Sequence, residues 1–357
     1  MSEDVNAIVS GLAETENVAA LCSLADQRVE AGDAAFVADL GIALWRRYGD
    51  EPGAPWQYRS AFDHVVRLLT LSPGTVGEAV LMLSVTANHR QCRYAAALLA
   101  SAHAGVGLAD ALGAAAPQEL RACLLHELVL RRLPVEADWT DEPWWREHPL
   151  AWLPAALTPL EQWPEVPRYG FNGSGVGLPS QVSVAVGGGG AVPPALETTS
   201  QADAAAIQAA VLNWTVKSNG RSQARTYELG ARLRPDAVAG TLRGLGLESL
   251  QGLDGVGSGT PENAWEQLFG AARSGGAYSS GELGAYGRLA AWQSVAALAG
   301  ARTGAPISEV EAAVQACAWY SFAGASDWFQ RVAWDIGLAA VSPDGRRLAV
   351  LTATDTD

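Results

Sequence analysis

The densest group of chemically useful side chains lies between Gly275 and Trp292. Two Gly-Ala-Tyr triplets end at Tyr278 and Tyr286, and the second leads into Arg288 and then Trp292. Four-residue spacing places Arg288 and Trp292 on one helix face. Tyrosine hydroxyls and a guanidinium bind carboxylates, so we predict a ligand site formed by Tyr278, Tyr286, Arg288 and Trp292. The alternative interpretation is structural, with glycines that allow close helix packing and aromatic rings that belong to the core.

Carboxylates near the end of the chain are the candidates for acid–base chemistry. Asp327 and Asp335 lie in a stretch rich in aromatic and aliphatic residues. A charge between Trp334 and Ile336 must point outward, pair with an arginine or take part in catalysis. We therefore name Asp327 and Asp335 as candidate catalytic residues.

Asp355 and Asp357 form a second acidic pair at the end of the sequence. Two carboxylates brought together are able to hold a divalent cation, but chain ends are usually frayed and solvated. We expect both side chains to be exposed to solvent, and we predict no metal site.

The residue types exclude several cofactor chemistries. Lys217 is the only lysine and follows Val216, so the chain has no P-loop and no kinase-type lysine, and pyridoxal phosphate would require that same lysine. His126 and Glu127 begin like a zinc-protease helix, but Leu130 stands where the second histidine is required. All five histidines precede residue 169, which excludes a Ser-His or Cys-His pair within the second half. We expect no cofactor.

The charge and the cysteine content of the chain indicate which kinds of partner it binds and in which cellular compartment it lies. The 357 residues include 24 basic and 38 acidic side chains, a net charge of −14, so no basic field attracts nucleic acid. Residues 169–196 carry no charge but contain eight glycines and three prolines, and cannot form a spanning helix. Widely spaced cysteines and the lack of a secretory signal pattern favour free thiols in the cytoplasm. We expect neither a nucleic-acid nor a membrane partner.

Residues 1–134 are predicted to form a helical domain. Apolar residues recur at three- and four-residue spacing, and Gly, Pro or Asp separate the segments. Short connections favour antiparallel neighbours, so we expect a repeat-like stack of helix pairs or an irregular bundle. The predicted helices include 33–48, 57–69, 78–88, 93–103 and 118–133.

Residues 135–175 form a predicted connector that is rich in tryptophan and proline. One interpretation is that the rings fill the space between two domains. The other is an aromatic surface that binds a sugar or a peptide. The rings are Trp139, Trp144, Trp145, Trp152 and Trp163.

Residues 176–357 are predicted to form an α+β domain, which makes the whole protein α+β. The run 181–186 alternates like a strand, and 223–229 is a second predicted strand. Apolar runs at 332–341 and 347–354 flank a Ser-Pro-Asp-Gly turn signature and predict a closing β-hairpin. The glycines between 252 and 259 are interpreted as a flexible turn, with an anion-binding loop as the alternative. The predicted helices are 201–212, 236–243, 262–273, 283–298 and 309–322.

Three segments carry a resemblance to a known family. Residues 284–292, 334–338 and 353–357 resemble an uncharacterised actinobacterial family, catalogued as a domain of unknown function. The resemblance covers mainly residues 213–357. It implies no activity and no catalytic residue.

Two classes of function follow from these observations. The first is a non-catalytic cytoplasmic interaction or ligand-binding protein, because helical stacks usually bind rather than catalyse. The second is a carboxylate-dependent hydrolase or isomerase, in which Asp327 or Asp335 acts as the base while Tyr286 and Arg288 orient the substrate.

Overall fold

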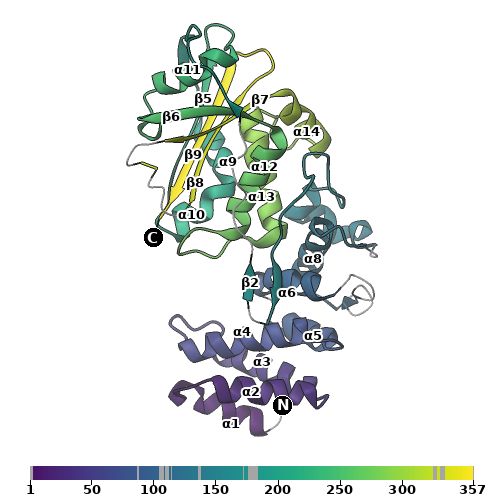
Figure 1. Ribbon diagram of the computed structural model, residues 1–357. Helices are drawn as coiled ribbons and strands as arrows, with labels where there is room; N and C mark the ends of the chain where they lie inside the picture. Colours follow the sequence, from purple (N-terminus) through teal and green to yellow (C-terminus); the bar gives the residue numbers. More distant parts are fainter. Residues whose placement is uncertain are drawn as a thin grey trace. The chain divides into compact units, whose positions relative to one another are not determined.

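The computed structural model describes residues 3–86, 88–103, 108, 112–113, 115–135, 138–171, 173–175, 184–324, 328–329 and 334–356. The chain divides into two compact units. Unit 1 comprises Met1–Ala151 and Val166–Val176, and unit 2 comprises Trp152–Glu165 and Gly177–Asp357. The segment that we predicted as a connector is therefore shared between the units, and each unit has its own buried core (Figure 1).

Unit 1 is mainly helical, as the apolar spacing predicts. Helix α3 contacts α1, α2, α4 and α5, while α4 contacts α6 and α6 contacts α8. Successive helices therefore pack on their near neighbours in the chain and form a stack (Figure 1). Their bounds are α1 Glu3–Gly11, η1 Leu12–Glu14, α2 Ala19–Glu30, α3 Ala34–Tyr48, α4 Trp56–Leu71, α5 Val76–Thr86, α6 His89–Ala102 and α8 Gln118–Leu130.

Helix α3 shows how the sequence builds this stack. The Asp33 side chain caps the helix by accepting a hydrogen bond from the N–H of Phe36 at 3.3 Å. Val37, Leu40 and Leu44 recur at helical spacing and are buried in the core. The helix predicted over 33–48 is confirmed.

The tryptophans of unit 1 pack around short 3-10 helices. These are η2 Asp138–Asp141, η3 Pro143–Glu147 and η4 Pro149–Trp152, and a two-stranded sheet of β1 Arg168–Gly170 and β2 Gly173–Gly175 belongs to the same unit. Trp139 and Trp145 are buried. The Trp145 ring stacks on His126 of α8, with 5.9 Å between ring centroids. Trp139 and Trp145 are therefore core residues of unit 1, whereas Trp163, in the segment 152–165 of unit 2, is 74% exposed.

Unit 2 contains, among its described residues, a seven-stranded antiparallel sheet with the order β3-β6-β7-β8-β9-β5-β4. The last two strands in the chain form the predicted hairpin, in which Ala339 pairs with Val350. The α+β class is confirmed. The strands are β3 Val184–Ala185, β4 Ala195–Glu197, β5 Arg221–Leu229, β6 Leu253–Gly259, β7 Ala318–Gly324, β8 Trp334–Val341 and β9 Arg347–Asp355.

Both edges of the sheet are short. Strand β3 has two residues, and β4 has three exposed residues that directly follow Pro193 and Pro194. Proline removes a backbone donor, and a short strand offers few groups for pairing, so both features oppose the addition of a further strand.

The two faces of the sheet carry different neighbours because side chains alternate along each strand. Tyr227 and Val350 pack with Leu242 of α11, and we call this side the α11 face. Arg347 points to the other side and donates to the carbonyl of Leu298 near the end of α13, so we call that side the α13 face. Figure 1 shows α11 and α13 on opposite sides of the strands.

Helices surround the sheet of unit 2. Their bounds are α9 Gln201–Ile207, η5 Ala209–Val211, α10 Leu212–Lys217, η6 Pro235–Ala237, α11 Val238–Gly244, η7 Glu248–Leu250, α12 Pro261–Ser274, α13 Leu283–Ala299 and α14 Ile307–Ala316. Within the described residues, no helix combines the length and the apolar character that crossing a bilayer requires.

Two sequence predictions for unit 2 were wrong. The glycine-rich segment interpreted as a turn contains β6, and the helix predicted over 309–322 ends at Ala316, after which β7 begins at Ala318. Strands β6 and β7 pair, with Gly259 opposite Trp319.

Candidate functional site

A fully buried ion pair lies between α13 and the segment 152–165 of unit 2. Arg288 Nε donates to Glu161 Oε1 at 2.6 Å, and Arg288 Nη2 donates to Glu161 Oε2 at 2.7 Å. Both side chains have a solvent exposure of 0%. The two parallel hydrogen bonds form a bidentate pair, the strongest arrangement for a guanidinium and a carboxylate.

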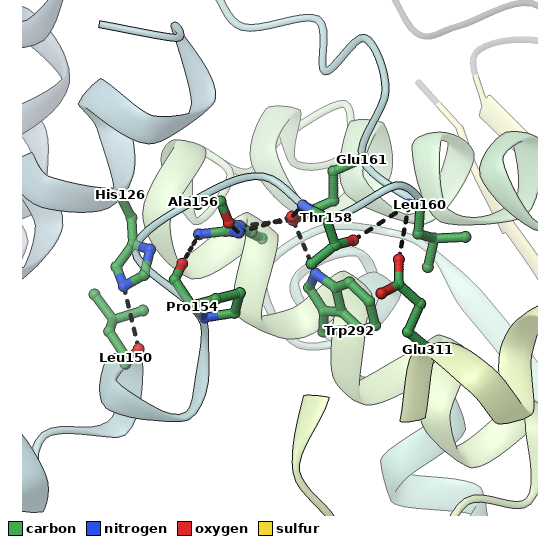
Figure 2. A network of polar contacts seen from close by, with 10 residues as sticks. His126, Leu150, Pro154, Ala156, Thr158, Leu160, Glu161, Trp292 and Glu311 are labelled. Atoms are coloured by element: carbon green, nitrogen blue, oxygen red, sulfur yellow. Dashed lines mark hydrogen bonds and ion pairs between the residues drawn. The ribbon is translucent and has the colours of Figure 1, made fainter. Parts of the chain in front are cut away.

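Further hydrogen bonds complete this network. Arg288 also donates to the carbonyls of Pro154 and Ala156, at 3.0 and 2.9 Å. Trp292 Nε1 donates to Glu161 Oε1 at 2.8 Å, so Arg288 and Trp292 use the shared helix face that their spacing predicts. Figure 2 shows Trp292 bonded to the Glu161 carboxylate, with Pro154 and Ala156 nearby. The carboxylate that Arg288 binds belongs to the chain itself.

The same segment is held at its far end by α14. Glu161 Oε2 accepts from the N–H of Thr158 at 3.0 Å, and Glu311 Oε1 accepts from the N–H of Leu160 at 3.0 Å. These contacts are drawn in Figure 2. Pro306 is the N-cap of α14, so the Glu311 side chain is free of a capping role and bonds to the segment instead. The network therefore joins segment 152–165 to α13 and α14.

A tightly packed loop connects α12 and α13 and carries Tyr278. Gly275 at its start has φ of 78°, and Leu283 at its end has φ of 62°, which is costly for a branched side chain. A Cβ atom on Gly276 would lie 2.0 Å from a carboxylate oxygen of Asp355. Glycine is required at this position because the loop backbone lies directly against Asp355.

Asp355 holds this loop in place. Its carboxylate accepts from the Ser218 hydroxyl at 2.8 Å and from the N–H of Ala277. The Ser218 oxygen in turn accepts from the N–H of Tyr278 at 3.0 Å. Asp355 is buried at the end of β9, so the expectation that it is frayed and solvated was wrong.

The outer side of this loop and helix α10 form an exposed apolar surface. Tyr278 is 63% exposed, and Leu212 and Val216, which lie one helical turn apart on α10, are 54% and 69% exposed. Lys217 Nζ and Glu282 Oε1 form an ion pair of 2.9 Å beside them. We call Leu212, Val216, Lys217, Tyr278 and Glu282 the Tyr278 surface. Figure 1 shows α10 beside the loop that leads into α13.

The predicted ligand-binding residues therefore differ in their exposure to solvent. Tyr278 is exposed on the loop, Tyr286 is half-buried on α13, and Arg288 and Trp292 are in the interior. Sequence reasoning missed Leu212 and Val216 as surface residues. Apolar residues four positions apart share one helix face, but this spacing does not tell whether the face is buried or exposed, and the helix predicted over 201–212 did not include Val216.

The candidate catalytic residue Asp335 lies on the α11 face of the sheet. It pairs in register with Thr354, which pairs with Arg221 on β5, so these three side chains lie in a row on one face. Tyr286 and Arg288 belong to α13, on the opposite side. The structure does not bring Asp335 together with them. The other candidate, Asp327, lies outside the described residues.

Unit 1 contains a second polar network, around Glu119 of α8. Its Oε1 atom accepts from Arg93 Nε at 2.7 Å, and its Oε2 atom lies 3.1 Å from His148 Nε2 and 3.2 Å from His89 Nδ1. His148 Nδ1 accepts from the N–H of Leu150, so the proton of neutral His148 is on Nε2 and is donated to Glu119. Figure 2 shows a further histidine of α8, His126, bonded to the Leu150 carbonyl.

Burial alone would raise the pKa of Glu119, but hydrogen bonds from His148 and Arg93 outweigh it and lower the pKa to about 2 from its ordinary value of 4.5. A carboxylate with a lowered pKa stabilises the folded protein above pH 4.5 and loses that contribution as the pH falls toward 2. Between pH 6 and pH 3.5 we expect the stability advantage of the native chain over Glu119→Gln to shrink by about 1 kcal/mol.

Urea unfolding at the two pH values measures this difference. Glu51→Gln, which removes an exposed carboxylate paired with Arg47, is the control for the loss of one surface charge. A constant difference between Glu119→Gln and the native chain across this range would contradict the prediction.

Among the described residues, no three His, Cys, Asp or Glu side chains are arranged to hold a metal ion. Cys22, Cys92, Cys123 and Cys317 are free thiols. Burial is the main cause that raises the pKa of all four, to about 12 for Cys92, so these thiols are unreactive.

The fold and the site define a two-unit α+β protein with a buried ion pair between Arg288 and Glu161 and with exposed aromatic and aliphatic side chains on the Tyr278 surface. A sequence model described as a family of unknown function, DUF6183, matches residues 19–357, and the chain belongs to this family. The match begins with α2 and covers most of both units, so the resemblance to residues 213–357 alone was too narrow. Comparisons with curated proteins and with solved structures gave no match.

Proposed function

We propose that this protein is a non-catalytic binding protein that holds a protein partner on the Tyr278 surface. The observation that carries the proposal is the exposure of Tyr278, Leu212 and Val216 on two segments of unit 2. These segments are joined by the hydrogen bond from the N–H of Tyr278 to Ser218 and by the Lys217–Glu282 ion pair. Exposed apolar side chains that are gathered together and bordered by charges are typical of protein interaction sites.

The rigidity of the Tyr278 loop supports this assignment. Hydrogen bonds to buried Asp355 and to Ser218 fix the backbone at Ala277 and Tyr278. A loop backbone that is already held in place loses little conformational freedom when the loop binds a partner. Tyrosine is also one of the residue types that contribute most to binding at interfaces.

The placement of the other candidates favours binding over catalysis. Arg288 is engaged by Glu161 and two backbone carbonyls, and Asp335 lies on the other face of the sheet. The hydrolase or isomerase alternative needs Asp327 or Asp335 together with Tyr286 and Arg288 around one substrate. Within the residues that the structure describes, which do not include Asp327, no observation favours that arrangement.

The cellular setting is part of the same proposal. We place the protein in a reducing cytoplasm, which is supported by its four free thiols. The single lysine among 24 basic residues indicates a G+C-rich genome and supports the actinobacterial source. The net charge of −14 and the absence of a basic field argue against nucleic acid as the partner.

Site-specific photocrosslinking in cells tests the proposal. A photoreactive benzoylphenylalanine at position 216 is expected to give a protein adduct, because Val216 belongs to the proposed interface. The control carries the same group at position 196, since Leu196 is 68% exposed on β4. Adding Tyr278→Ala to the first variant is expected to lower the adduct yield about tenfold. Equal labelling at positions 216 and 196, or no adduct at 216, would refute the proposal.

A further inference from the structure

We infer that His148 is a pH-sensitive switch, which releases the backbone N–H of Leu150 when its ring takes up a proton. The switch lies in unit 1 and goes beyond the proposed binding surface. Two histidine rings, His126 and His148, both stack on the ring of Trp145, with centroids 5.9 and 6.2 Å from it. Both histidines also bond to the backbone of the same residue, Leu150.

The two bonds at Leu150 respond differently to a proton. His126 Nε2 lies 3.1 Å from the carbonyl oxygen of Leu150 (Figure 2). A carbonyl oxygen only accepts, so this nitrogen carries a proton in the neutral and in the cationic ring. His148 Nδ1 accepts from the N–H of Leu150 at 3.2 Å, so it carries no proton in this arrangement. Protonation of both rings would therefore break the bond of His148 and keep the bond of His126.

The proton enters His148 at Nδ1 because the other ring nitrogen already carries one. Nε2 of the neutral ring donates to Glu119 Oε2 at 3.1 Å. Glu119 stays ionised at the pH values at which histidine titrates, since its pKa is about 2. It holds the cationic ring by a charge-assisted hydrogen bond while Leu150 is released. His148 thus bonds to Leu150 and Glu119 in one state, and to Glu119 alone in the other.

The charges around His148 admit this proton although the side chain is only 10% exposed. Among the described residues, Glu119 is the one charged group that pairs with the ring directly. His89 shares the same carboxylate oxygen but is 73% exposed, so water and salt screen its charge. The titratable and charged groups near His148 are Glu119 and His126 on α8, His89 and Arg93 on α6, Arg121 with Glu142 beside the Trp144 ring, and the exposed chain neighbours Arg146 and Glu147.

The released N–H lies where the chain leaves the first part of unit 1. Leu150 belongs to η4, and the chain passes from unit 1 to unit 2 between Ala151 and Trp152. The Leu150 side chain is fully buried, so the backbone of the turn gains freedom while the side chain remains in the core. Acid is therefore expected to loosen this turn locally.

Hydrogen exchange at the Leu150 amide of the full-length protein, followed by NMR, tests the switch. Each rate is divided by the rate of an unprotected amide at the same pH, which gives a protection factor. Between pH 8 and pH 5, the range in which histidine changes its charge, the protection factor of Leu150 in the native chain is expected to fall about tenfold. A protection factor that does not change over this range would overturn the inference.

His148→Asn is expected to abolish this pH dependence. An asparagine side chain accepts from the N–H two residues further on, as His148 does, but it does not titrate. His103→Asn is the matched control, because His103 Nε2 bonds to the Thr70 carbonyl at 2.9 Å and makes no contact with Leu150. This control is expected to behave like the native chain. A tenfold fall that persists in His148→Asn would exclude His148 as the switch.

Nitrogen NMR of the histidine rings tests the geometry in the native chain, without any substitution. At pH 8 the His148 ring is expected to be the Nε2–H tautomer, and at pH 5 both of its nitrogens are expected to carry protons. An Nδ1–H tautomer at pH 8, or a ring that is still neutral at pH 5, would overturn the inference. The Tyr278 surface takes no part in these measurements, so the proposed function is tested separately by its photocrosslink.

Discussion

Arg288→Ala is expected to lower the free energy of unfolding of unit 2 by about 3–5 kcal/mol. The substitution leaves the Glu161 carboxylate buried at 0% exposure without its cation, and an uncompensated charge in the interior is very costly. It also leaves the carbonyls of Pro154 and Ala156 without these donors. Urea unfolding followed by tryptophan fluorescence measures the loss.

Arg225→Ala is the matched control for this prediction. Arg225 pairs with Glu197 at 3.1 Å, but both side chains are partly exposed, so the loss is expected to be under about 1 kcal/mol. A double variant, Arg288→Ala with Glu161→Ala, is expected to cost less than the sum of the two single variants, because each removes the same pair. Equal small losses for Arg288→Ala and Arg225→Ala would show that the buried pair does not hold segment 152–165.

Gly337→Ala is expected to lower the free energy of unfolding by about 3 kcal/mol. Gly337 lies in β8, inside the sheet, and an added Cβ atom would lie 2.3 Å from the carbonyl oxygen of Phe322 and 2.6 Å from its ring. The oxygen belongs to the backbone of β7 and cannot rotate away. Relief therefore requires the two strands to move apart.

Gly255→Ala provides the comparison for Gly337→Ala. Gly255 is also a strand glycine, in β6, but no atom lies within 4 Å of the position of its Cβ. The expected change is within about 0.5 kcal/mol. If both alanine variants unfold at the same urea concentration, the close contact between β7 and β8 is not rigid.

Local patterns were enough to predict most elements of the fold. The spacing of apolar residues predicted α3 and α4, and the turn signature before Arg347 predicted the final hairpin. The predictions failed where tertiary neighbours outweigh local preference. Local preference predicts that Gly259 ends a strand or helix, yet Gly259 lies in β6 and pairs with Trp319 of β7. A strand partner so distant in the chain leaves no signal in the local sequence.

The candidate site shows even more clearly that contacts between distant residues cannot be predicted from the local sequence. The sequence predicted that Arg288 and Trp292 share one helix face, which the structure confirms, and that Arg288 would bind the carboxylate of a ligand. It did not show that the carboxylate is Glu161, 127 residues earlier in the chain. Exposure depends on such long-range contacts. Tyr278 and Tyr286 end identical triplets, but only the loop held by Asp355 leaves its tyrosine in solvent.

The short edge strands have a consequence for how large an assembly of this protein becomes. A sheet with a long free edge recruits further strands without limit and grows into fibres. Here β3 and β4 are two and three residues long, and prolines precede β4. The addition of further strands is therefore opposed at both edge strands that the structure describes. Crowding is not expected to draw this chain into fibres through the edges of its sheet.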